Sequence, residues 1–324
     1  MNWLIVGQGA MGLLWYHHLS QTQKAKTKDD IYPPNKLSLL ASNQQHLTQN
    51  NYQFTALNKQ TYNGTVNYAQ TEQLQAADSV FLCLKSYQIN HAVAQIAGQL
   101  KANCNIILAH NGMGTLEKLP QTFIDKHTIY ALLTTHGCLR NAPLNITHTG
   151  SGESSIGLVS EQKSRQKPGQ QSGQEDRVRD ALLTNTLNKA LPSVKFEANI
   201  AEKQWLKLAI NCVINPITAL NNIDNGLVNN TQFTKQIQAL LMEVVAVART
   251  QGIVLVNEAL EISVRQVAQA TAKNCSSMRC DVLANRPTEI DYINGYIHRL
   301  GQKNALATPE NTKLWQEIKR LCSH

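Results

Sequence analysis

The sequence predicts an α/β domain followed by an all-α domain. Three observations lead to this prediction: an apolar strand that runs into a glycine-rich turn at residues 7–12, alternating strands and helices up to about residue 198, and helical segments beyond it. A chain of 324 residues is long enough for about two domains, each with its own core. The predicted domains are residues 1–198 and 199–324.

The first domain is expected to contain a parallel sheet covered on both faces. The apolar run 2–6 ends at a glycine, as a buried parallel strand does, and residues 10–19 have helical periodicity. Alternation in residues 52–68 around Asn63-Gly64 predicts a hairpin with its turn at that dipeptide. Further strands are expected at 37–41, 79–84, 105–109 and 128–135, with a helix over 88–100.

The second domain is predicted from a change of character near residue 200. The polar stretch Ser160–Asp176, with Pro168 and two glycines, is expected to form a surface loop. Beyond it, mainly helical patterns cover residues 201–221, 231–251, 256–273, 276–300 and 309–321.

The composition excludes several classes of protein. With 42% hydrophobic and 16% charged residues, the chain is an ordinary globular protein. Its seven cysteines are scattered without a C-x-x-C pair, so we expect free thiols and no metal site. No signal peptide and no apolar run of about 18 residues is present, so the expected location is cytoplasmic, without a membrane partner.

The formal charge of +8 does not by itself indicate nucleic-acid binding. Such binding requires basic residues on one face or in a recognised module, and here they are spread along the chain. We therefore expect no nucleic-acid partner. A mild positive field attracts an anionic cofactor and an anionic small-molecule substrate instead. The oligomeric state, monomer or homodimer, stays open.

The strongest motif is Gly7-Gln8-Gly9-Ala10-Met11-Gly12, which fits G-x-G-x-x-G between a strand and a helix. In a Rossmann-type domain Gly7 allows the tight turn, Gly9 lets the backbone approach a pyrophosphate, and Gly12 lets the helix pack on the strand. The alternative is a helix opened by flexible glycines. The end of the second strand, Leu39–Gln44, carries neither the acid typical of NAD enzymes nor an arginine for a 2′-phosphate.

A polar stripe interrupts an apolar helix in the second domain. Lys207, Asn211 and Asn215 are four residues apart and share one helix face, and Pro216 predicts a kink or a helix end. The stripe is either solvated or part of a site. Ketone reduction needs a proton donor at the oxygen where negative charge develops, and a lysine can act there as acid and as electrostatic stabiliser.

Eight segments in order along nearly the whole chain resemble the ketopantoate reductase (2-dehydropantoate 2-reductase) family. Residues near 21–36 and 160–178 look like insertions. The matching segments are Leu84-Lys85, His110-Asn111-Gly112-Met113-Gly114, Thr134-Thr135-His136, His148-Thr149-Gly150-Ser151-Gly152, Lys207 to Pro216, Asn274-Cys275-Ser276-Ser277-Met278, Thr288-Glu289-Ile290-Asp291-Tyr292-Ile293-Asn294-Gly295 and Pro309-Glu310-Asn311-Thr312.

The resemblance implies NADPH-dependent reduction of 2-dehydropantoate to (R)-pantoate, a step of pantothenate and coenzyme A biosynthesis. It assigns Lys207 as the general acid that protonates the ketone oxygen. The substrate is implied to lie against Asn111, Lys207, Asn211, Asn215, Asn225 and Ser277, in the cleft between the domains. The cofactor is implied to contact the turn from Gly7 to Gly12 and also Lys85, Asn111, Glu289 and the backbone of Cys138.

Several of these residues also have a purely structural interpretation. Lys85 can be a solvent-facing strand end, and Asn111-Gly112 a simple turn. Ser276-Ser277 can be an N-cap and nothing more, and Glu289 a solvated acid. We interpret His136 and His148 as structural.

One departure from the family concerns the cofactor. Members often carry an arginine after the second strand to bind the 2′-phosphate, whereas this chain has Ser42 in about that place. Preference for NADPH is therefore expected to be weaker, or the contact to come from elsewhere. Two other functions stay open: a β-hydroxyacid-type dehydrogenase for another small 2-keto or 3-hydroxy acid, and a nucleotide-sensing protein without catalysis.

Overall fold

The computed structural model describes residues 1–24, 36–41, 49–160 and 173–322. By their internal contacts they form two compact units. Unit 1 comprises Met1–His110 and Lys118–Ile200, and unit 2 comprises Asn111–Glu117 and Ala201–His324. The short segment Asn111–Glu117 thus packs with the helical unit, which the prediction of two continuous domains does not include.

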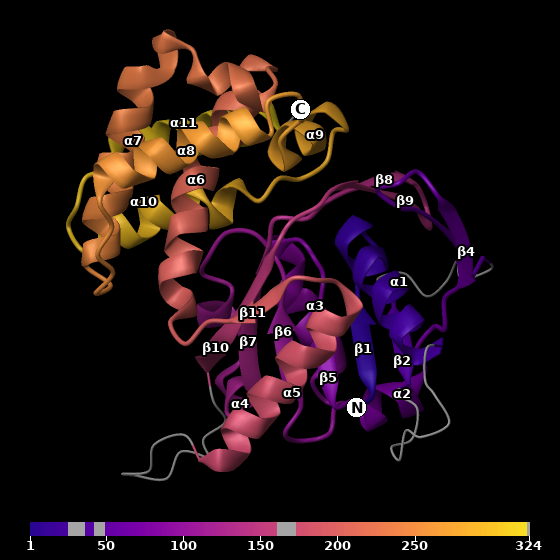
Figure 1. Ribbon diagram of the computed structural model, residues 1–324. Helices are drawn as coiled ribbons and strands as arrows, with labels where there is room; N and C mark the ends of the chain where they lie inside the picture. Colours follow the sequence, from indigo (N-terminus) through magenta and orange to yellow (C-terminus); the bar gives the residue numbers. More distant parts are fainter. Residues whose placement is uncertain (25–35, 42–48, 161–172, 323–324) are drawn as a thin grey trace. The chain divides into compact units, whose positions relative to one another are not determined.

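Within the described part of unit 1, seven strands form the main sheet (Figure 1). They are β1 (Trp3–Val6), β2 (Leu37–Leu40), β5 (Ser79–Leu82), β6 (Asn105–Leu108), β7 (Thr128–Thr134), β10 (Ser154–Ser160) and β11 (Val194–Phe196). The order is β11-β10-β7-β6-β5-β1-β2, and the five strands from β2 to β7 are parallel. Strand β10 runs antiparallel to β7. The predicted α/β class is confirmed.

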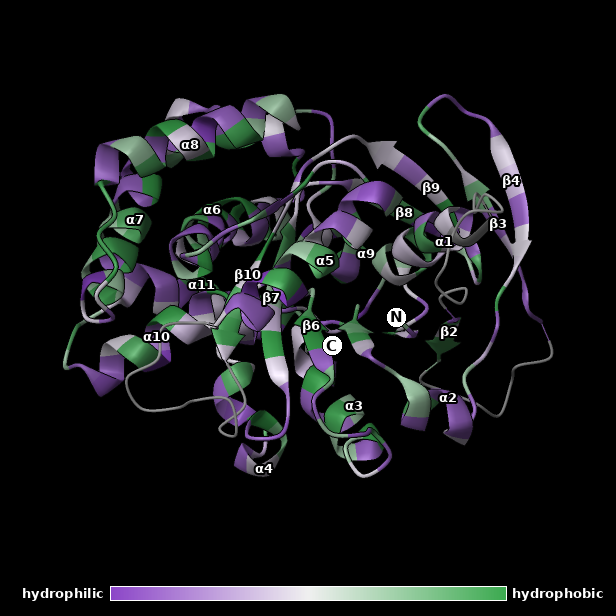
Figure 2. Ribbon diagram, turned by 60° about the horizontal axis from the view of Figure 1, so that its bottom comes forward, coloured by the Kyte–Doolittle hydropathy of each residue, from purple (hydrophilic) through white to green (hydrophobic). Residues whose placement is uncertain are grey.

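Helices cover both faces of this sheet. They are α1 (Ala10–Lys24), α2 (Thr71–Ala76), α3 (Ile89–Ile96), α4 (Gln121–Ile124) and α5 (Gln174–Ala190). Helix α1 connects β1 to β2, toward one side of the sheet. Helices α3 and α4 connect β5 to β6 and β6 to β7, so there the chain moves toward the other side of the sheet. Because such crossovers are right-handed, α1 lies on one face and α3 and α4 on the other (Figure 2). Helix α5 packs beside α1.

A second sheet of unit 1 contains the expected hairpin, but the predicted turn is wrong. Its strands lie in the order β4-β3-β9-β8 and are β3 (Asn51–Thr55), β4 (Thr61–Thr65), β8 (Gly137–Ala142) and β9 (Asn145–Gly150). Asn63-Gly64 lies inside β4, where a Cβ on Gly64 would meet the ring of Tyr52 at 2.6 Å. The turn lies at residues 56–60, because the Asn58 side chain accepts the Gln60 N–H at 3.0 Å and Lys59 adopts a positive φ.

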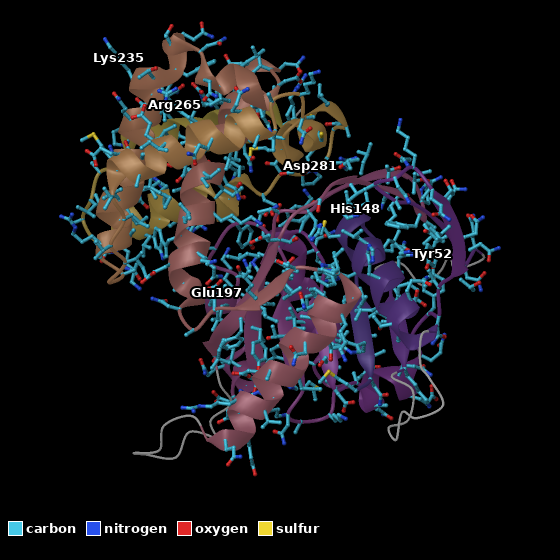
Figure 3. All side chains as sticks on the ribbon, in the orientation of Figure 1. Tyr52, His148, Glu197, Lys235, Arg265 and Asp281 are labelled. Carbon is cyan, nitrogen blue, oxygen red and sulfur yellow. The ribbon has the colours of Figure 1, made fainter. Side chains whose placement is uncertain are left out.

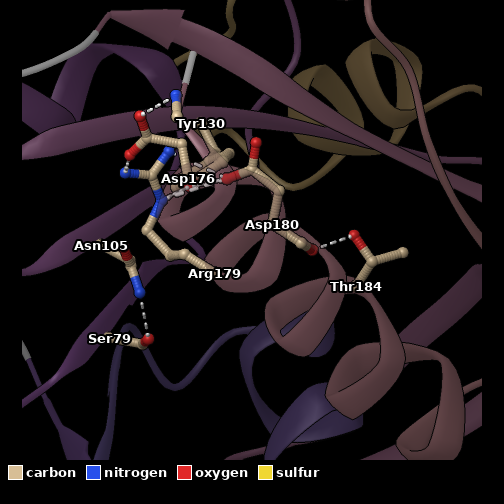
Figure 4. Close-up of polar contacts among 8 residues, drawn as sticks. Ser79, Asn105, Tyr130, Asp176, Arg179, Asp180 and Thr184 are labelled. Atoms are coloured by element: carbon tan, nitrogen blue, oxygen red, sulfur yellow. Dashed lines mark hydrogen bonds and ion pairs between the residues drawn. The ribbon is translucent and has the colours of Figure 1, made fainter.

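The core of unit 1 lies between the main sheet and α1. The Trp15 ring of α1 lies 5.2 Å from that of Phe81 on β5, and both side chains are fully buried. Polar contacts tie α5 to β7 (Figure 4): the Tyr130 hydroxyl donates to Asp180 at 2.6 Å and accepts from Arg179 at 2.7 Å. These contacts satisfy a phenol that is otherwise enclosed by apolar side chains.

In its described residues, unit 2 is helical. Its helices are α6 (Ile200–Asn221), α7 (Thr234–Arg249), α8 (Asn257–Ala270), α9 (Ser277–Leu283), α10 (Asn294–Lys303) and α11 (Pro309–Leu321), and short 3₁₀ turns η5 (Asn225–Asn229) and η7 (Ile290–Tyr292) join them. Apolar residues of α6, α7, α10 and α11 share one core. The mainly helical segment predicted over 276–300 contains two helices, α9 and α10, since Pro287 disfavours helix at the residue before it.

Helix α6 continues through Pro216 to Asn221, in agreement with the helical pattern predicted over residues 201–221, so of the two alternatives at Pro216 the helix end is excluded. Proline removes the N–H that Cys212 O would accept, and the Asn294 side chain supplies a donor there at 3.0 Å. The missing bond is thus replaced by a residue distant in the sequence.

Two predictions concern residues of which the structure describes little. Ser42, Asn43 and Gln44 lie outside the described residues, as do residues 161–172 of the expected loop. The end of that expected loop is helical, since α5 begins at Gln174. Among the helices of the described residues, none is long and apolar enough to cross a membrane.

Candidate active site

The glycine turn of unit 1 lies between β1 and α1, and two of its glycines are required by packing. Gly7 has a φ of +110°, and a Cβ there would lie 2.6 Å from Cys83 O. A Cβ on Gly12 would lie 1.9 Å from Gly7 O. Either contact is shorter than van der Waals contact, so the turn can close only with glycine at these positions.

Gly9 differs from its neighbours because no heavy atom lies within 4 Å of where its Cβ would be. The backbone there is open to an approaching ligand. The first turn of α1 contains no acidic side chain, so the positive end of the helix is not neutralised. Strand β1 also lies between β2 and β5, where the order of the sheet reverses. These features fit the pyrophosphate of a dinucleotide.

Cys138, another predicted cofactor residue, lies near this turn, and so does Tyr68, which the sequence did not identify. The Cys138 thiol of β8 lies 3.5 Å from Ala10 O, and burial raises its pKa to about 12, so it stays a neutral thiol. The Tyr68 hydroxyl lies 3.5 Å from the Gln8 side chain. Met11 is partly buried against the core.

Lys85 lies near the end of β5, at the edge of the sheet where β1 runs into the glycine turn. Because β1 and β5 are adjacent and parallel, both strands end at this edge. The Lys85 N–H donates to the Gln88 side chain at 3.1 Å, and its side chain is partly exposed. Lys85 therefore lies at the same end of the sheet as the glycine turn.

In unit 2, the polar stripe of α6 runs from exposure into the core. Lys207 and Asn211 are partly exposed, whereas Asn215 is 6% exposed. Around them the helix is apolar, and Leu208, Cys212 and Val213 belong to the core of the unit. The stripe is therefore not a solvated helix face along its whole length.

Lys207 has an altered acidity. Although part of its side chain reaches solvent, burial by the surrounding protein lowers its pKa from 10.5 to about 8, and the charge of Glu289 acts in the opposite direction. Glu289 is 4% exposed, so it is not a solvated acid. Its carboxylate accepts the Asn111 side-chain amide at 3.4 Å. Lys207, Glu289 and Asn111 therefore form one polar group.

The turn at Asn111-Gly112 brings Asn111 to this group. The Met113 N–H donates to Tyr292 O at 2.8 Å, which joins the turn to η7 just beyond Glu289. Gly112 has a φ of +80°, and a Cβ there would lie 2.3 Å from Tyr292 O. Glycine is thus required for the close approach of the two segments.

Asn225 and Ser277 lie on neighbouring segments. The Asn225 N–H donates to Asn274 O at 3.1 Å, and its amide donates to the Thr271 hydroxyl at 3.0 Å. Its side-chain oxygen is buried and accepts no hydrogen bond from the described residues. Ser276 is the N-cap of α9 and accepts the Arg279 N–H at 3.1 Å, whereas Ser277 is exposed. The capping role thus belongs to Ser276.

One residue that the sequence did not identify, Thr218, connects these segments. The Thr218 hydroxyl of α6 lies 2.7 Å from the Ser276 hydroxyl, and both side chains are buried. Thr218 donates to Ile214 O at 2.7 Å, so it accepts from Ser276. A buried hydroxyl in an otherwise apolar helix is the signal that could have identified Thr218.

His136 and His148 pack together in unit 1, where Figure 3 labels His148 and Tyr52 on the second sheet. His136 Nδ1 lies 3.1 Å from His148 Nε2 and accepts the Gly152 N–H at 3.2 Å. Burial lowers the pKa of both imidazoles, so both are neutral at pH 7. These contacts agree with a structural interpretation.

Comparison with known proteins identifies the family. The family described as ketopantoate reductase PanE/ApbA matches residues 3–161, and its C-terminal part matches residues 199–321. The 2-dehydropantoate 2-reductase of Vibrio cholerae is 33% identical over 323 residues, covering 99% of this chain and 98% of that protein. That of Shigella flexneri is 36% identical over 259 residues, covering 80% of this chain and 79% of that protein.

Solved structures share the whole fold. D-mandelate dehydrogenase in complex with NADH and anilino(oxo)acetate has a TM-score of 0.83 at 20% identity, covering 100% of this chain and 99% of that one. A PanE/ApbA family ketopantoate reductase from Ralstonia eutropha JMP134 has a TM-score of 0.79 at 22% identity, with the same coverage. The sequence matches, together with an α/β unit and a helical unit, show that this chain belongs to the ketopantoate reductase PanE/ApbA family of oxidoreductases.

Proposed function

We propose that this chain reduces 2-dehydropantoate to (R)-pantoate with NADPH, the step that serves pantothenate and coenzyme A biosynthesis, and that Lys207 is the proton donor. The observation that carries the proposal is the polar group of unit 2. In that group a lysine with a pKa of about 8 is associated with a buried carboxylate, in a chain of the ketopantoate reductase family.

Reduction of the ketone adds a hydride to C2 and a proton to the C2 oxygen. The hydride would come from a nicotinamide dinucleotide when one is bound. Lys207 Nζ donates the proton as negative charge develops on the oxygen, and its own charge stabilises that oxygen until transfer. With a pKa of about 8 it is mostly protonated at pH 7, yet it is a stronger acid than an ordinary lysine.

Glu289 keeps Lys207 in the charged form that the proton transfer requires. Burial alone favours the neutral amine, and the carboxylate opposes this effect. Asn111, which donates to Glu289, holds the carboxylate in place and lies near both the substrate and the cofactor in our proposal. We also assign a contact with the cofactor to Glu289.

The substrate has a carboxylate, a ketone and a hydroxyl group, all of which form hydrogen bonds. We assign their recognition to the amides of Asn211, Asn215 and Asn225 and to the Ser277 hydroxyl, near the carboxylate. Two observations support this assignment. The buried side-chain oxygen of Asn225 accepts no hydrogen bond from the described residues, and the Ser277 hydroxyl is not used as the N-cap of α9, because Ser276 has that role. Neutral groups orient the substrate without perturbing the charge of Lys207.

The cofactor proposal rests on the open backbone at Gly9 and the side chains around it. The turn from Gly7 to Gly12 would hold the pyrophosphate, with Lys85 and the Cys138 backbone contacting the rest of the dinucleotide. NADPH is the proposed cofactor, with a weaker preference over NADH than in relatives that have an arginine at Ser42.

The test is oxidation of NADPH by the purified chain with 2-dehydropantoate, beside NADH and 2-oxoisovalerate, which lacks the hydroxymethyl group. We expect kcat/KM to be highest for NADPH with 2-dehydropantoate. For 2-oxoisovalerate it should be at least about 100-fold lower, because buried amides would lose the substrate hydroxyl as a hydrogen-bond partner. Equal efficiency on a panel of unrelated 2-keto acids would favour another dehydrogenase. Binding of NADPH without any turnover would favour a sensor.

A further inference from the structure

Helix α6 contains a gap in its own hydrogen bonding one turn beyond Asn211. Pro216 has no N–H, so Cys212 O lacks the donor that a regular helix would supply. Cys212 is fully buried, and water cannot easily replace that donor. The Asn294 amide fills the gap, donating to Cys212 O at 3.0 Å.

Asn294 is itself held by a directional network. Its amide also donates to Asn311 Oδ1 at 2.9 Å. The Asn311 amide in turn donates to Leu240 O at 3.2 Å and to Glu243 at 2.8 Å. Because Cys212 O, Leu240 O and the carboxylate can only accept, the orientation of both amides is determined. Both asparagines are fully buried.

The network ends on the first turn of α11. The Glu243 carboxylate of α7 accepts the backbone N–H groups of Glu310 at 2.8 Å and Asn311 at 2.9 Å. A carboxylate at this place satisfies donors that a helix start leaves free. Four helices of unit 2, α6, α7, α10 and α11 (Figure 1), are therefore connected through one chain of buried polar contacts.

The two ends of the Asn294–Cys212 bond lie on the segments that carry Lys207 and Glu289. Cys212 directly follows Asn211 on the helix that carries Lys207, and η7 separates Glu289 from Asn294. We infer that Asn294 is a positioning residue: its amide replaces the donor missing at Pro216 and fixes α6 against the segment from Glu289 to Asn294. This holds Lys207 and Glu289 at their working separation, an inference that rests on the proposed function for the role of Lys207.

The inference predicts what the loss of the amide does. In Asn294→Leu, of similar size but without a donor, Cys212 O and Asn311 lose their partner and α6 is released from this segment. The influence of Glu289 on Lys207 then weakens. Pro216→Ala restores a backbone N–H to the helix, so Cys212 O regains a donor and the amide becomes dispensable for it.

The experiment compares full-length wild type with Asn294→Leu, Pro216→Ala, and the double variant. Asn229→Leu is the matched control, since the Asn229 amide donates to Arg265 O at 3.2 Å elsewhere in unit 2. NMR of [ε-¹³C]lysine, assigned through Lys207→Arg, gives the pKa of Lys207 without turnover. Steady-state rates give kcat and KM for 2-dehydropantoate, and fluorescence gives the Kd for NADPH.

We expect Asn294→Leu to lower the pKa of Lys207 and to lower kcat about tenfold, with the NADPH Kd unchanged. Pro216→Ala in the same chain gives Cys212 O a donor again but does not tie α6 to the segment from Glu289 to Asn294, so both losses should persist in the double variant. Asn229→Leu should cause neither loss. If Asn294→Leu alone does not fold, the Lys207 titration is compared between Pro216→Ala and the double variant, in both of which Cys212 O has a backbone donor, and a lower pKa in the double variant is expected.

An unchanged Lys207 titration in Asn294→Leu would overturn the inference, as would a loss matched by Asn229→Leu. Recovery of the Lys207 pKa in the double variant would overturn it too, because it would show that only the unsatisfied Cys212 O matters and not the tie from α6 to Asn294. Absence of turnover in the wild type would instead contradict the proposed function. In that case the lysine titration still decides whether Asn294 positions Lys207.

Discussion

The acid role of Lys207 predicts a particular dependence of the reaction on pH. The pKa of this lysine is lowered from 10.5 to about 8, first by burial and against the opposing charge of Glu289. An acid is active while protonated, so activity is lost as the pH rises through this pKa. With a pKa of about 8, about 90% of the lysine is protonated at pH 7, about 10% at pH 9 and about 1% at pH 10.

The assay is the initial rate of NADPH oxidation with 2-dehydropantoate from pH 6 to 10.5 at constant ionic strength. We expect kcat/KM to be level below pH 7.5 and to fall about tenfold for each unit above pH 8. An ordinary lysine would leave the rate level to about pH 10. The deuterium isotope effect with [4-²H]NADPH establishes that hydride transfer limits the rate, and the NADPH Kd over the same range controls for cofactor loss.

The substitution Glu289→Gln tests the same assignment by changing the pKa of Lys207. The amide retains an acceptor for Asn111 but removes the negative charge that raises the pKa of Lys207. The alkaline fall in rate should therefore move to lower pH. A profile that stays level to pH 10 in the wild type, or one that moves to higher pH in Glu289→Gln, would refute the assignment of Lys207 as the acid.

Three further predictions use features of either unit. Gly9→Ala should retain the melting temperature of the wild type, because its Cβ meets no atom within 4 Å, yet it should weaken NADPH binding at least about tenfold. Gly12→Ala, whose Cβ would lie 1.9 Å from Gly7 O, should fail to fold or should melt at a far lower temperature. Calorimetry and fluorescence titration distinguish the two. Ser276→Ala should lower the free energy of unfolding by at least about 1 kcal/mol, because it removes both the N-cap and the buried hydrogen bond to Thr218. Ser277→Ala should leave the free energy of unfolding unchanged and raise the KM for 2-dehydropantoate. Urea unfolding and initial rates test both. Burial lowers the pKa of His127 to about 4, so the folded chain stays neutral there while the unfolded chain takes up a proton below pH 6.5. The free energy of unfolding should therefore fall by up to about 3 kcal/mol between pH 6.5 and 4, and His127→Leu should remove this part of the slope in urea unfolding, whereas an equal slope in the variant would contradict it.

The parts of the fold that the sequence predicted have strong local patterns. The apolar run of β1, the glycines of the turn and the periodicity of α1 and α6 each follow from neighbouring residues. Strand β8, by contrast, is largely exposed, and β11 is only three residues long, so neither has the apolar signature of a buried strand. Helix α5 begins in a polar stretch whose periodicity is weak.

Contacts between distant segments explain the errors. The segment Asn111–Glu117 joins unit 2 because Met113 bonds Tyr292, and no local pattern encodes this contact. Pro216 is a valid signal for a helix end, but Asn294, 82 residues from Cys212, supplies the missing donor. In both cases a contact between segments distant in the sequence determines the structure.

The candidate site was predictable in part. Spacing alone placed Lys207, Asn211 and Asn215 on one face of α6, and the motif alone identified the glycine turn. The roles of Asn225, Ser277 and Glu289 came from the resemblance to the family, since isolated polar residues carry no such signal. The association of Glu289 with Lys207 required the structure, because the two residues are far apart in the sequence.

The most direct test of the account is the rate of 2-dehydropantoate reduction by wild type and Lys207→Ala, measured with NADPH at saturation and with NADPH binding determined for both. The account predicts rapid turnover by the wild type. It also predicts a loss of about 100-fold or more in kcat for the variant, with the cofactor still bound. Near-normal turnover by Lys207→Ala would remove this lysine from the mechanism and contradict the central claim.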